Sequence, residues 1–352
     1  MRRIMQTDKK TIFFLLSLIL SFVVILLLIK LLLAAYHISG WQVILDLIRL
    51  PFSSSTKFFA VIAAWFPLLL VLASVLYAFR AGFWNIGVEG QIVIGAVSTT
   101  YIIRILQNST ISPALVIVIG LAFGVIGGGV WAFISAVLKT QSGLHEIVSG
   151  IGLNVLALAI SNWLILGPWR RFGAGSLGGT DMFNQAVWLP DIGNTPISYL
   201  FLLIGLIIYF AVSFILRRTR YGLHLAAFHL NPKAKYINAS FTSQSIWRIL
   251  VFSGMLAGFT GAILVLGTYH RLIPSVASGM GYIAILISLM VQQQPLWAAV
   301  VALLFSMTNT NSSQLAMQYQ LAPSIVGVFQ AGWAFCMLVF YQTFQKVFRV
   351  RE

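Results

Sequence analysis

Residues 80–95 of this 352-residue chain read R-A-G-F-W-N-I-G-V-E-G-Q-I-V-I-G. Apolar stretches lie on both sides, yet the segment itself contains glycines, amides and a carboxylate. A carboxylate at the middle of a membrane helix costs about 2.5 to 3.5 kcal/mol on insertion scales, so we expect Glu89 to face a packed or hydrated interior. Glycine permits backbone conformations that a side chain blocks, and non-helical backbone at membrane depth persists only inside protein. The segment therefore predicts a broken membrane helix.

The composition of the whole chain places this break in an all-α polytopic membrane protein. Hydrophobic residues make up 59% of the chain, charged residues 8%, and the mean hydropathy is +0.95. Soluble proteins contain about 25% charged residues. The formal net charge of +15 does not indicate a nucleic-acid partner, because the basic residues separate apolar runs and do not form one patch with interleaved aromatics.

Hydropathy predicts about ten transmembrane helices, some of them short or broken. Glycines at 120, 124 and 128 repeat at helical spacing and predict a close helix contact. Two predicted spans, 279–291 and 295–308, are short, so each is either broken or extended by the neighbouring polar residues. The predicted spans are about 12–35, 58–79, 86–106, 113–138, 147–166, 198–216, 249–267, 279–291, 295–308 and 325–344.

The distribution of Lys and Arg predicts the orientation. With cytoplasmic N- and C-termini, most of the 22 basic residues fall on the cytoplasmic side, as the positive-inside rule requires. The chain is then a single transmembrane domain, residues 1–352. Its predicted external loop is about 167–197, and a basic cytoplasmic loop lies at about 217–248.

Several kinds of chemistry are excluded by missing motifs. The chain has no phosphate-binding G-x-x-x-x-G-K-[ST], no H-E-x-x-H and no G-x-S-x-G sequence, so we expect neither ATP hydrolysis nor another enzymatic activity from this chain alone. Its five histidines are scattered without ligand spacing, so no metal site is predicted. The lone Cys336 excludes an intrachain disulfide.

The candidate residues for a translocation path each have two interpretations. Glu89 is a functional candidate because intramembrane carboxylates are rare, but it could instead accept hydrogen bonds from backbone amides freed by the break. The buried amides could bind hydroxyls or a base edge of a cargo, or they could join helices. Phe83 and Trp84 could stack on a planar cargo or belong to the interfacial aromatic belt. The amide candidates are Asn85, Gln91, Asn154 and Asn162.

Several sequence motifs resemble a known family. N-I-G-V-E-G-Q at 85–91 resembles the signature of permease subunits of bacterial ABC importers for simple sugars and nucleosides, in the class of the ribose, galactose and branched-chain amino-acid permeases. The resemblance continues in L-K-T-x-x-G-x-x-E-I at 138–147, in L-N at 153–154 and in G-M-G-Y-I-A-I at 279–285. It extends to Q-Q-Q-P-L-W-A-A-V-V-A-L-L-F at 292–305. The resemblance covers most of residues 60–340.

In that family a cytoplasmic R-A-x-G-x-N-P-x-A-A-like helix docks on the ATPase, and this chain has A-A-F-H-L-N-P-K-A-K at 226–235. The chain differs from the family pattern at Ala226, His229 and Lys235. From the residues alone, the basic loop is a topogenic signal. The resemblance implies ATPase coupling instead, and the residues assigned to it are Arg217, Arg218, Arg220, Ala227, Asn231, Pro232, Lys233 and Ala234.

The resemblance also implies the partners. It predicts a permease subunit of an ABC importer in the bacterial inner (cytoplasmic) membrane, paired with a second and different permease subunit. ABC ATPase subunits bind ATP, which this chain does not bind, and an extracytoplasmic substrate-binding protein or lipoprotein delivers the cargo. The implied cargo is a nucleoside, a related ribosyl compound such as riboflavin, or a simple sugar. The alternative is an ion-coupled secondary transporter or channel that works without an ATPase, with Glu89 as its ion site.

Overall fold

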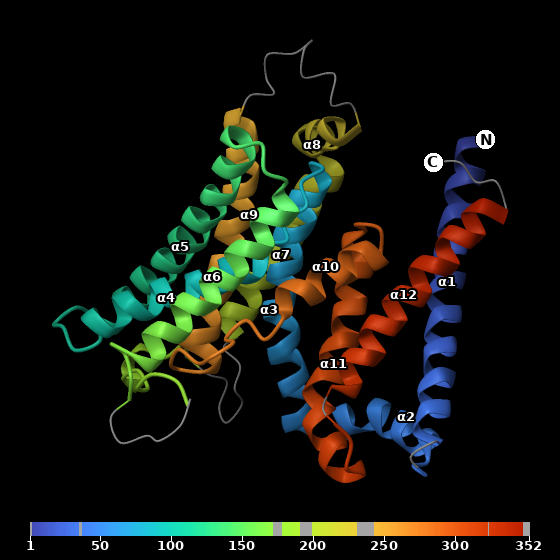
Figure 1. The fold of residues 1–352 in the computed structure, drawn as a ribbon, viewed down its shortest axis with the longest axis horizontal. Coiled ribbons are helices and arrows are strands. Elements are labelled where there is room, and N and C mark those ends of the chain that lie inside the picture. The colour runs from blue at the N-terminus through green and yellow to red at the C-terminus, as the bar shows by residue number, and fades with distance from the viewer. Residues whose placement is uncertain are drawn as a thin grey trace. The chain divides into compact units, whose positions relative to one another are not determined.

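The computed structural model describes residues 2–34, 37–171, 178–190, 199–230, 243–322 and 324–347, and Figure 1 shows their arrangement. For residues 2–11, 199–201 and 228–230 only the backbone is described. These ranges are helical and contain no strand, which confirms the all-α prediction. The α-helices are α1 (Arg2–Ala34), α2 (Gly40–Arg49), α3 (Ser55–Arg80), α4 (Val88–Leu106), α5 (Pro113–Gln141), α6 (Glu146–Leu166), α7 (Tyr199–Arg218), α8 (Arg220–Leu230), α9 (Ser243–Ile263), α10 (Met280–Met290), α11 (Pro295–Tyr319) and α12 (Ile325–Val347).

Six helices in the described ranges are long and apolar enough to cross a membrane. A seventh candidate is the pair α7 and α8, which meet at a bend of 69°. A polytopic membrane protein is therefore confirmed, while the number of about ten spans stays a prediction. The predicted spans that do not qualify are α4, α10 and α11, which contain the short or polar segments singled out in the sequence.

For one of the two short predicted spans, the structure confirms the alternative of extension into the neighbouring polar residues. The span expected at 295–308 continues as α11 to Tyr319, through the polar run T-N-T-N-S-S. This run stays helical because its side chains bond to the carbonyls of the preceding turn. The Oγ1 of Thr310 donates to the carbonyl of Ser306 at 2.8 Å, and the Nδ2 of Asn311 donates to that of Met307 at 2.7 Å. The adjacent prediction is confirmed as a short helix, because α10 has only 11 residues.

The structure divides into two compact units, and the single permease domain stays a prediction. The first unit comprises Met1–Ile62 and Leu289–Glu352. Within it α1 packs on α12, where the rings of Phe22 and Trp333 lie 4.9 Å apart and the indole of Trp333 donates to Ser21 at 3.1 Å. The second unit, Ala63–Ser288, contains α4 to α9 and the segment 80–95.

Glycines hold the core of the second unit together. The helices α5 and α9 run side by side, and α4 packs against both (Figure 1). A Cβ added to Gly128 would lie 2.3 Å from the carbonyl oxygen of Gly254, and one added to Gly258 would lie 2.2 Å from that of Gly124. A side chain at Gly95 would meet Gly258 at 2.4 Å. The close helix contact predicted from the glycine spacing is confirmed, and such contacts maximise van der Waals attraction where lipid offers no hydrophobic drive.

The described part of the predicted external loop, 178–190, packs on the residues that follow α9. The amide of Thr180 donates to the carbonyl of Leu272 at 2.9 Å, and the amide of Leu189 donates to that of Leu266 at 3.1 Å. The indole of Trp188 stacks on the imidazole of His270 with ring centroids 3.9 Å apart. This stretch is therefore an ordered cover over the end of α9.

Candidate translocation segment

The predicted helix break is present between α3 and α4. The helix α3 ends at Arg80, and α4 begins at Val88, so residues 81–87 connect them without forming a helix. Gly82 has a φ of +82°, a conformation that favours glycine, and the amides of Gly82 and Phe83 bond back to the carbonyls of Phe79 and Ala78. The glycine thus ends α3 and turns the chain toward the centre of the unit.

Glu89 lies in the first turn of α4 with 4% of its surface exposed. Its Oε1 accepts from the amide of Gly279 at 2.8 Å, and its Oε2 accepts from the amide of Gly281 at 2.8 Å. These amides belong to the start of α10, where helix amides have no partner within their own helix and the helix dipole favours a negative charge. Glu89 therefore joins the two glycine-rich breaks, 80–95 and 279–281, and both of its oxygens are engaged by backbone.

Asn85 and Gln91 form a reciprocal amide pair. The Nδ2 of Asn85 donates to the Oε1 of Gln91 at 2.9 Å, and the Nε2 of Gln91 donates to the Oδ1 of Asn85 at 2.9 Å. Asn85 also donates to the Oγ of Ser253 in α9 at 2.8 Å, and the Ser253 hydroxyl lies 2.9 Å from that of Ser74 in α3. Both amides are buried. The break is thereby tied to the two helices that pass beside it.

Asn154 in α6 also ties the helix break to a neighbouring helix. Its Oδ1 accepts from the amide of Gly90 at 2.8 Å, and its Nδ2 donates to the carbonyl of Ile86 at 2.9 Å and to the hydroxyl of Tyr282 at 3.1 Å. One amide thus satisfies backbone groups on both sides of the start of α4. The contact requires a small residue, because a Cβ on Gly90 would lie 2.9 Å from Asn154 Oδ1.

The structure brings four predicted path residues into one polar cluster, defined as Asn85, Glu89, Gln91 and Asn154. Asn162 lies about two helical turns farther along α6, and its buried Oδ1 accepts no hydrogen bond among the described residues. Of the two aromatics, Phe83 is 4% exposed, while Trp84 is 39% exposed and lies 5.0 Å from the ring of Phe79.

Sequence reasoning missed several members of this region. Ser74 and Ser253 stand alone in apolar runs and gave no signal, although they anchor Asn85. Tyr282 and the two glycines that bond Glu89 belong to the G-M-G-Y motif at 279–282, which carried the family resemblance without an assigned role. The two glycines meet Glu89 across about 190 residues, and Tyr282 meets Asn154 of α6 across 128, so neither contact has a local pattern.

A second polar contact explains the motif at 138–147. Lys139 at the end of α5 forms an ion pair with Glu146 at the start of α6, and the two are separated by a turn in which Gly143 has a φ of +67°. The ammonium of Lys139 also lies 5.2 Å from the ring centroid of Phe83, a cation–π distance. The motif therefore links the α5–α6 turn to residue 83 of the break.

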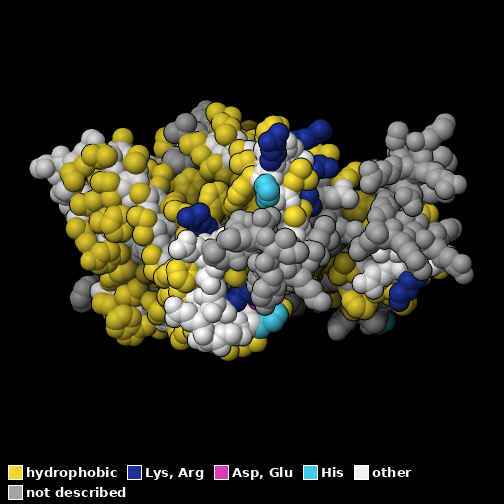
Figure 2. Space-filling model, turned by 90° about the horizontal axis from the view of Figure 1, so that it is seen from above, with side chains coloured by type: hydrophobic (Ala, Val, Ile, Leu, Met, Phe, Trp, Pro, Cys, Tyr) yellow, Lys and Arg dark blue, Asp and Glu magenta, His cyan; other side chains and the backbone are white. Residues whose placement is uncertain are grey.

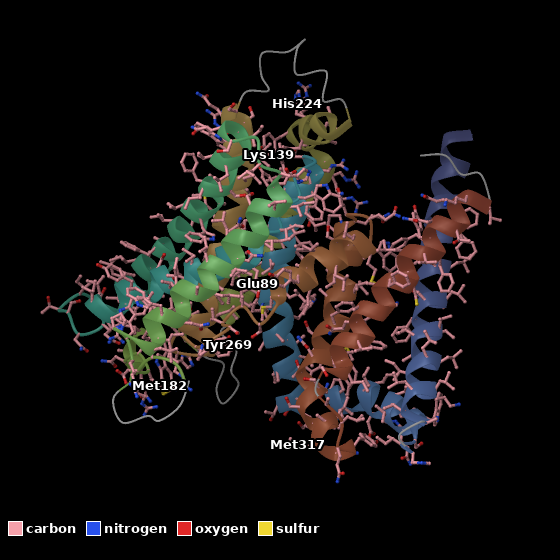
Figure 3. All side chains as sticks on the ribbon, in the orientation of Figure 1. Glu89, Lys139, Met182, His224, Tyr269 and Met317 are labelled. Carbon is pink, nitrogen blue, oxygen red and sulfur yellow. The ribbon has the colours of Figure 1, made fainter. Side chains whose placement is uncertain are left out.

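Five labelled side chains show how the second unit is arranged from one end to the other. Figure 3 shows Lys139 and His224 at one end, Met182 and Tyr269 at the other, and Glu89 between them. The first of these ends also contains the corner between α7 and α8 (Figure 1), where Arg217, Arg218 and Arg220 are exposed. Figure 2 looks onto this end and shows Lys, Arg and His side chains among apolar ones.

The predicted coupling residues are described only in part. The short helix expected before Asn231 is present as α8, and Ala227 on it is exposed. Asn231, Pro232, Lys233 and Ala234 lie outside the described residues.

Comparison with known proteins identifies the family. Residues 58–338 match the model of the branched-chain amino acid transport system permease component. The chain belongs to this permease family. No solved structure matches it.

Three similar proteins are permeases of ABC transporters. The guanosine ABC transporter permease protein NupP of Bacillus subtilis is 26% identical over 228 residues, which cover 64% of this chain and 64% of NupP, or just under two thirds of its length. The nucleoside permease NupB of Lactococcus lactis is 24% identical over 78% of this chain and 76% of its own. The glucose permease TsgB13 of Haloferax volcanii is 24% identical over 75% of this chain and 71% of its own.

Family membership confirms three predictions made from the sequence. The chain is an ABC permease of the simple sugar and nucleoside type, it is a transport component and not an enzyme, and it is a multi-pass membrane protein. The permease match includes the whole polar cluster and the start of α10, so the central contacts lie inside the part of the chain that defines the family.

Proposed function

We propose that this permease is the membrane-spanning subunit of an ATP-driven importer and forms half of a passage with a second, different permease subunit. The observation that carries the proposal is the permease-family match over residues 58–338, which contains the whole helix break. ATP binds to partner ATPase subunits, an extracytoplasmic binding protein or lipoprotein delivers the cargo, and the complex lies in the bacterial cytoplasmic membrane.

The proposed topology has about ten spans with cytoplasmic N- and C-termini. It is supported by the distribution of charge in the second unit, where the end that holds Lys139 also holds the exposed Arg217, Arg218 and Arg220. Clustered Lys and Arg beside membrane spans favour the cytoplasmic side. In this orientation the cover formed by 178–190 is external.

The translocation path is proposed to run along the break and the polar cluster. Because the amides and carboxylate of the cluster bond to backbone, to one another and to two neighbouring hydroxyls, their proposed task is to fix the shape of the path. Direct stacking on cargo is assigned to Trp84, which is 39% exposed, while the second candidate aromatic, Phe83, is buried. Asn162, with its unpaired buried oxygen, is the proposed polar contact farther along α6.

Coupling to the ATPase is assigned to the corner between α7 and α8 and to the residues after it. The exposed arginines at 217, 218 and 220 supply positive charge, and Ala227 with residues 231–234 supplies the family-like docking pattern. An exposed helix of this kind can lie in a groove of a partner. ATP-driven closure of the ATPases would then displace α8, and alternating access requires two packings that nucleotide and cargo stabilise differently.

The proposed cargo is a nucleoside. The support is that NupP and NupB carry guanosine and nucleosides by name, and that an exposed indole suits a planar base. The glucose permease TsgB13 makes a simple sugar the second candidate. Uptake of labelled guanosine and labelled glucose by cells that carry or lack this permease separates the two, because only the true cargo will depend on its presence.

The decisive experiment tests the coupling assignment. Replacing residues 226–235 by a Gly/Ser stretch of equal length should abolish co-purification of the ATPase while the protein still inserts in the membrane. A matched Gly/Ser replacement of the loop 107–112 at the opposite end should leave co-purification intact. Retention of the ATPase by the first variant would refute the assignment.

The ion-coupled alternative is tested on the isolated chain. Purified alone in liposomes, the permease should concentrate no solute under an imposed proton or sodium gradient, because its energy comes from a partner. Gradient-driven accumulation without any companion subunit would establish the alternative and would refute the proposed importer.

A further inference from the structure

Two tyrosines connect the proposed coupling helix to the helix that ends at the break. Tyr77 lies one turn before the end of α3, and Tyr221 lies in the first turn of α8. Their hydroxyl oxygens are 2.5 Å apart, and their rings lie nearly parallel, with an interplanar angle of 24° and centroids 6.4 Å apart. Tyr77 is 5% exposed and Tyr221 is 48% exposed. The pair therefore reaches from a buried helix to the surface of the unit.

The surroundings of the pair are apolar. A cavity of about 460 Å³ lies beside the two rings and is lined by Tyr77, Val212, Ile215, Thr219, Tyr221 and Phe252. The ring of Phe252 lies 4.7 Å from that of Tyr77. A hydrogen bond in apolar surroundings is stronger than one in water. Because the cavity leaves space between the helices, the hydroxyl contact bridges a region that side chains do not fill.

The corner that carries Tyr221 is closely packed and hydrogen-bonded. Thr219 accepts from the amide of Gly222 at 3.2 Å and donates to the carbonyl of Ile215 at 2.6 Å. A Cβ on Gly222 would lie 2.4 Å from the carbonyl oxygens of Ile215 and Leu216. The first turn of α8 is thus clamped onto the last turn of α7, so the corner moves as one piece with Tyr221 attached.

The turn that carries Tyr77 is joined directly to the break. Ala78, the next residue, accepts at its carbonyl oxygen from the amides of Ala81 and Phe83 at 3.1 and 3.0 Å. One turn earlier, Ser74 bonds to Ser253, which holds Asn85. A displacement of this part of α3 therefore displaces residues 81–85.

We propose that the hydroxyl pair of Tyr77 and Tyr221 is the positioning contact through which movement of the α7–α8 corner reaches the helix break. This inference rests on the proposed importer function and adds two residues that belong neither to the set assigned to ATPase coupling nor to the set assigned to the path. A contact that only held the fold together would affect stability. A contact that transmits movement affects how much cargo is moved for each ATP hydrolysed.

The test uses the assembled transporter in proteoliposomes, with its ATPase, second permease and binding protein. Tyr77→Phe and Tyr221→Phe each remove one hydroxyl and keep the ring. Each should lower cargo uptake per ATP hydrolysed about fivefold, the effect of one net hydrogen bond, while ATPase co-purification stays unchanged and the thermal midpoint falls by no more than about 2 °C. The double variant should be no worse than either single variant, because all three lack the same bond. Tyr101→Phe is the matched control, because Tyr101 is 54% exposed on α4.

Three outcomes would overturn the inference. The ratio of uptake to ATP hydrolysis could stay at the wild-type value in either single variant, the two effects could add in the double variant, or uptake could fall only in step with lost thermal stability. Failure of the proposed function is distinguishable from these, because the wild-type chain would then not associate with an ATPase at all.

Discussion

The polar cluster around Glu89 and the exposed corner between α7 and α8 use charge in opposite ways. At the cluster, a buried carboxylate and three buried amides form hydrogen bonds with backbone, with one another and with the hydroxyls of Ser253 and Tyr282. At the corner, Arg217, Arg218 and Arg220 point to the surface and are exposed. Buried polar groups must be satisfied within the protein, whereas exposed cations keep their charge available to a partner. From this difference we infer that the motif with the most unusual residues fixes architecture, and that the exposed charge is the place where a partner binds.

The largest effect is expected from removing the carboxylate of the cluster. Glu89→Ala leaves the amides of Gly279 and Gly281 buried without an acceptor, which should cost about 4 kcal/mol and sharply lower the thermal midpoint in detergent. Asp181→Ala is the control, because Asp181 lies at the surface and should change stability by less than about 0.5 kcal/mol. Equal midpoints for the two variants would show that Glu89 is not structural and would remove one side of the comparison.

The variant Glu89→Gln tests whether the carboxylate of Glu89 is needed for the structure or for transport. The amide keeps one oxygen for one backbone donor but presents an N–H group to the other, so we expect a loss of about 2 kcal/mol and impaired uptake. If uptake is lost while the thermal midpoint stays at the wild-type value, the carboxylate acts on cargo or ions. The architectural assignment would then be wrong.

Two glycines on α6 provide a matched pair for testing close packing around the cluster. A Cβ on Gly150 would lie 2.6 Å from the amide nitrogen of Gly87, whereas one on Gly152 would meet nothing within 4 Å. Gly150→Ala should destabilise by about 2 kcal/mol because backbone must shift. Gly152→Ala should be neutral or stabilising by up to about 1 kcal/mol, because alanine favours helix. Thermal midpoints in detergent measure both, and similar losses would contradict the geometry.

The smallest effect on stability is expected at the corner. Replacing Arg217, Arg218 and Arg220 by Ala should change stability by less than about 0.5 kcal/mol each, because surface charges contribute little. Co-purification of the ATPase should weaken and should become more sensitive to salt in the range where exposed charges are screened. A large loss of stability at the corner, or unchanged association, would erase the contrast with the polar cluster.

The sequence predicted the main features of the cluster for reasons that are local. Lone polar residues among apolar ones must be buried in protein, and glycines among them predict a break, which is why Asn85, Glu89 and Gln91 could be singled out. The glycines at 279 and 281 could be recognised as a second glycine-rich segment. Their role as hydrogen-bond donors to the Glu89 carboxylate could not. Ser74 and Ser253 could not be distinguished from ordinary helix serines.

Helix ends were less predictable where polar side chains satisfy their own helix. The polar run after Thr308 left two alternatives open in the sequence, a broken span or an extended one, and it continues α11 to Tyr319 because its hydroxyls and amides bond to carbonyls one turn earlier. Hydropathy measures the free energy of transfer to lipid and does not include hydrogen bonds that polar side chains form with carbonyls of their own helix. The sequence groups Asn162 with the other path residues because it is also an amide in an apolar span. It lies apart from the cluster, because residue type does not determine which helix positions meet.

By itself the sequence determined the class of the protein, its helical nature and the place where a membrane helix is interrupted, because transfer free energies and glycine conformations are properties of single residues and short segments. Only the tertiary structure decided what the interruption is bonded to. Glu89 meets amides about 190 positions away, and Tyr77 meets a hydroxyl on α8 144 positions away. Such pairings depend on which helices pack together, and helix packing is a sum over contacts between segments far apart in the sequence, as in the close glycine contacts of α4, α5 and α9.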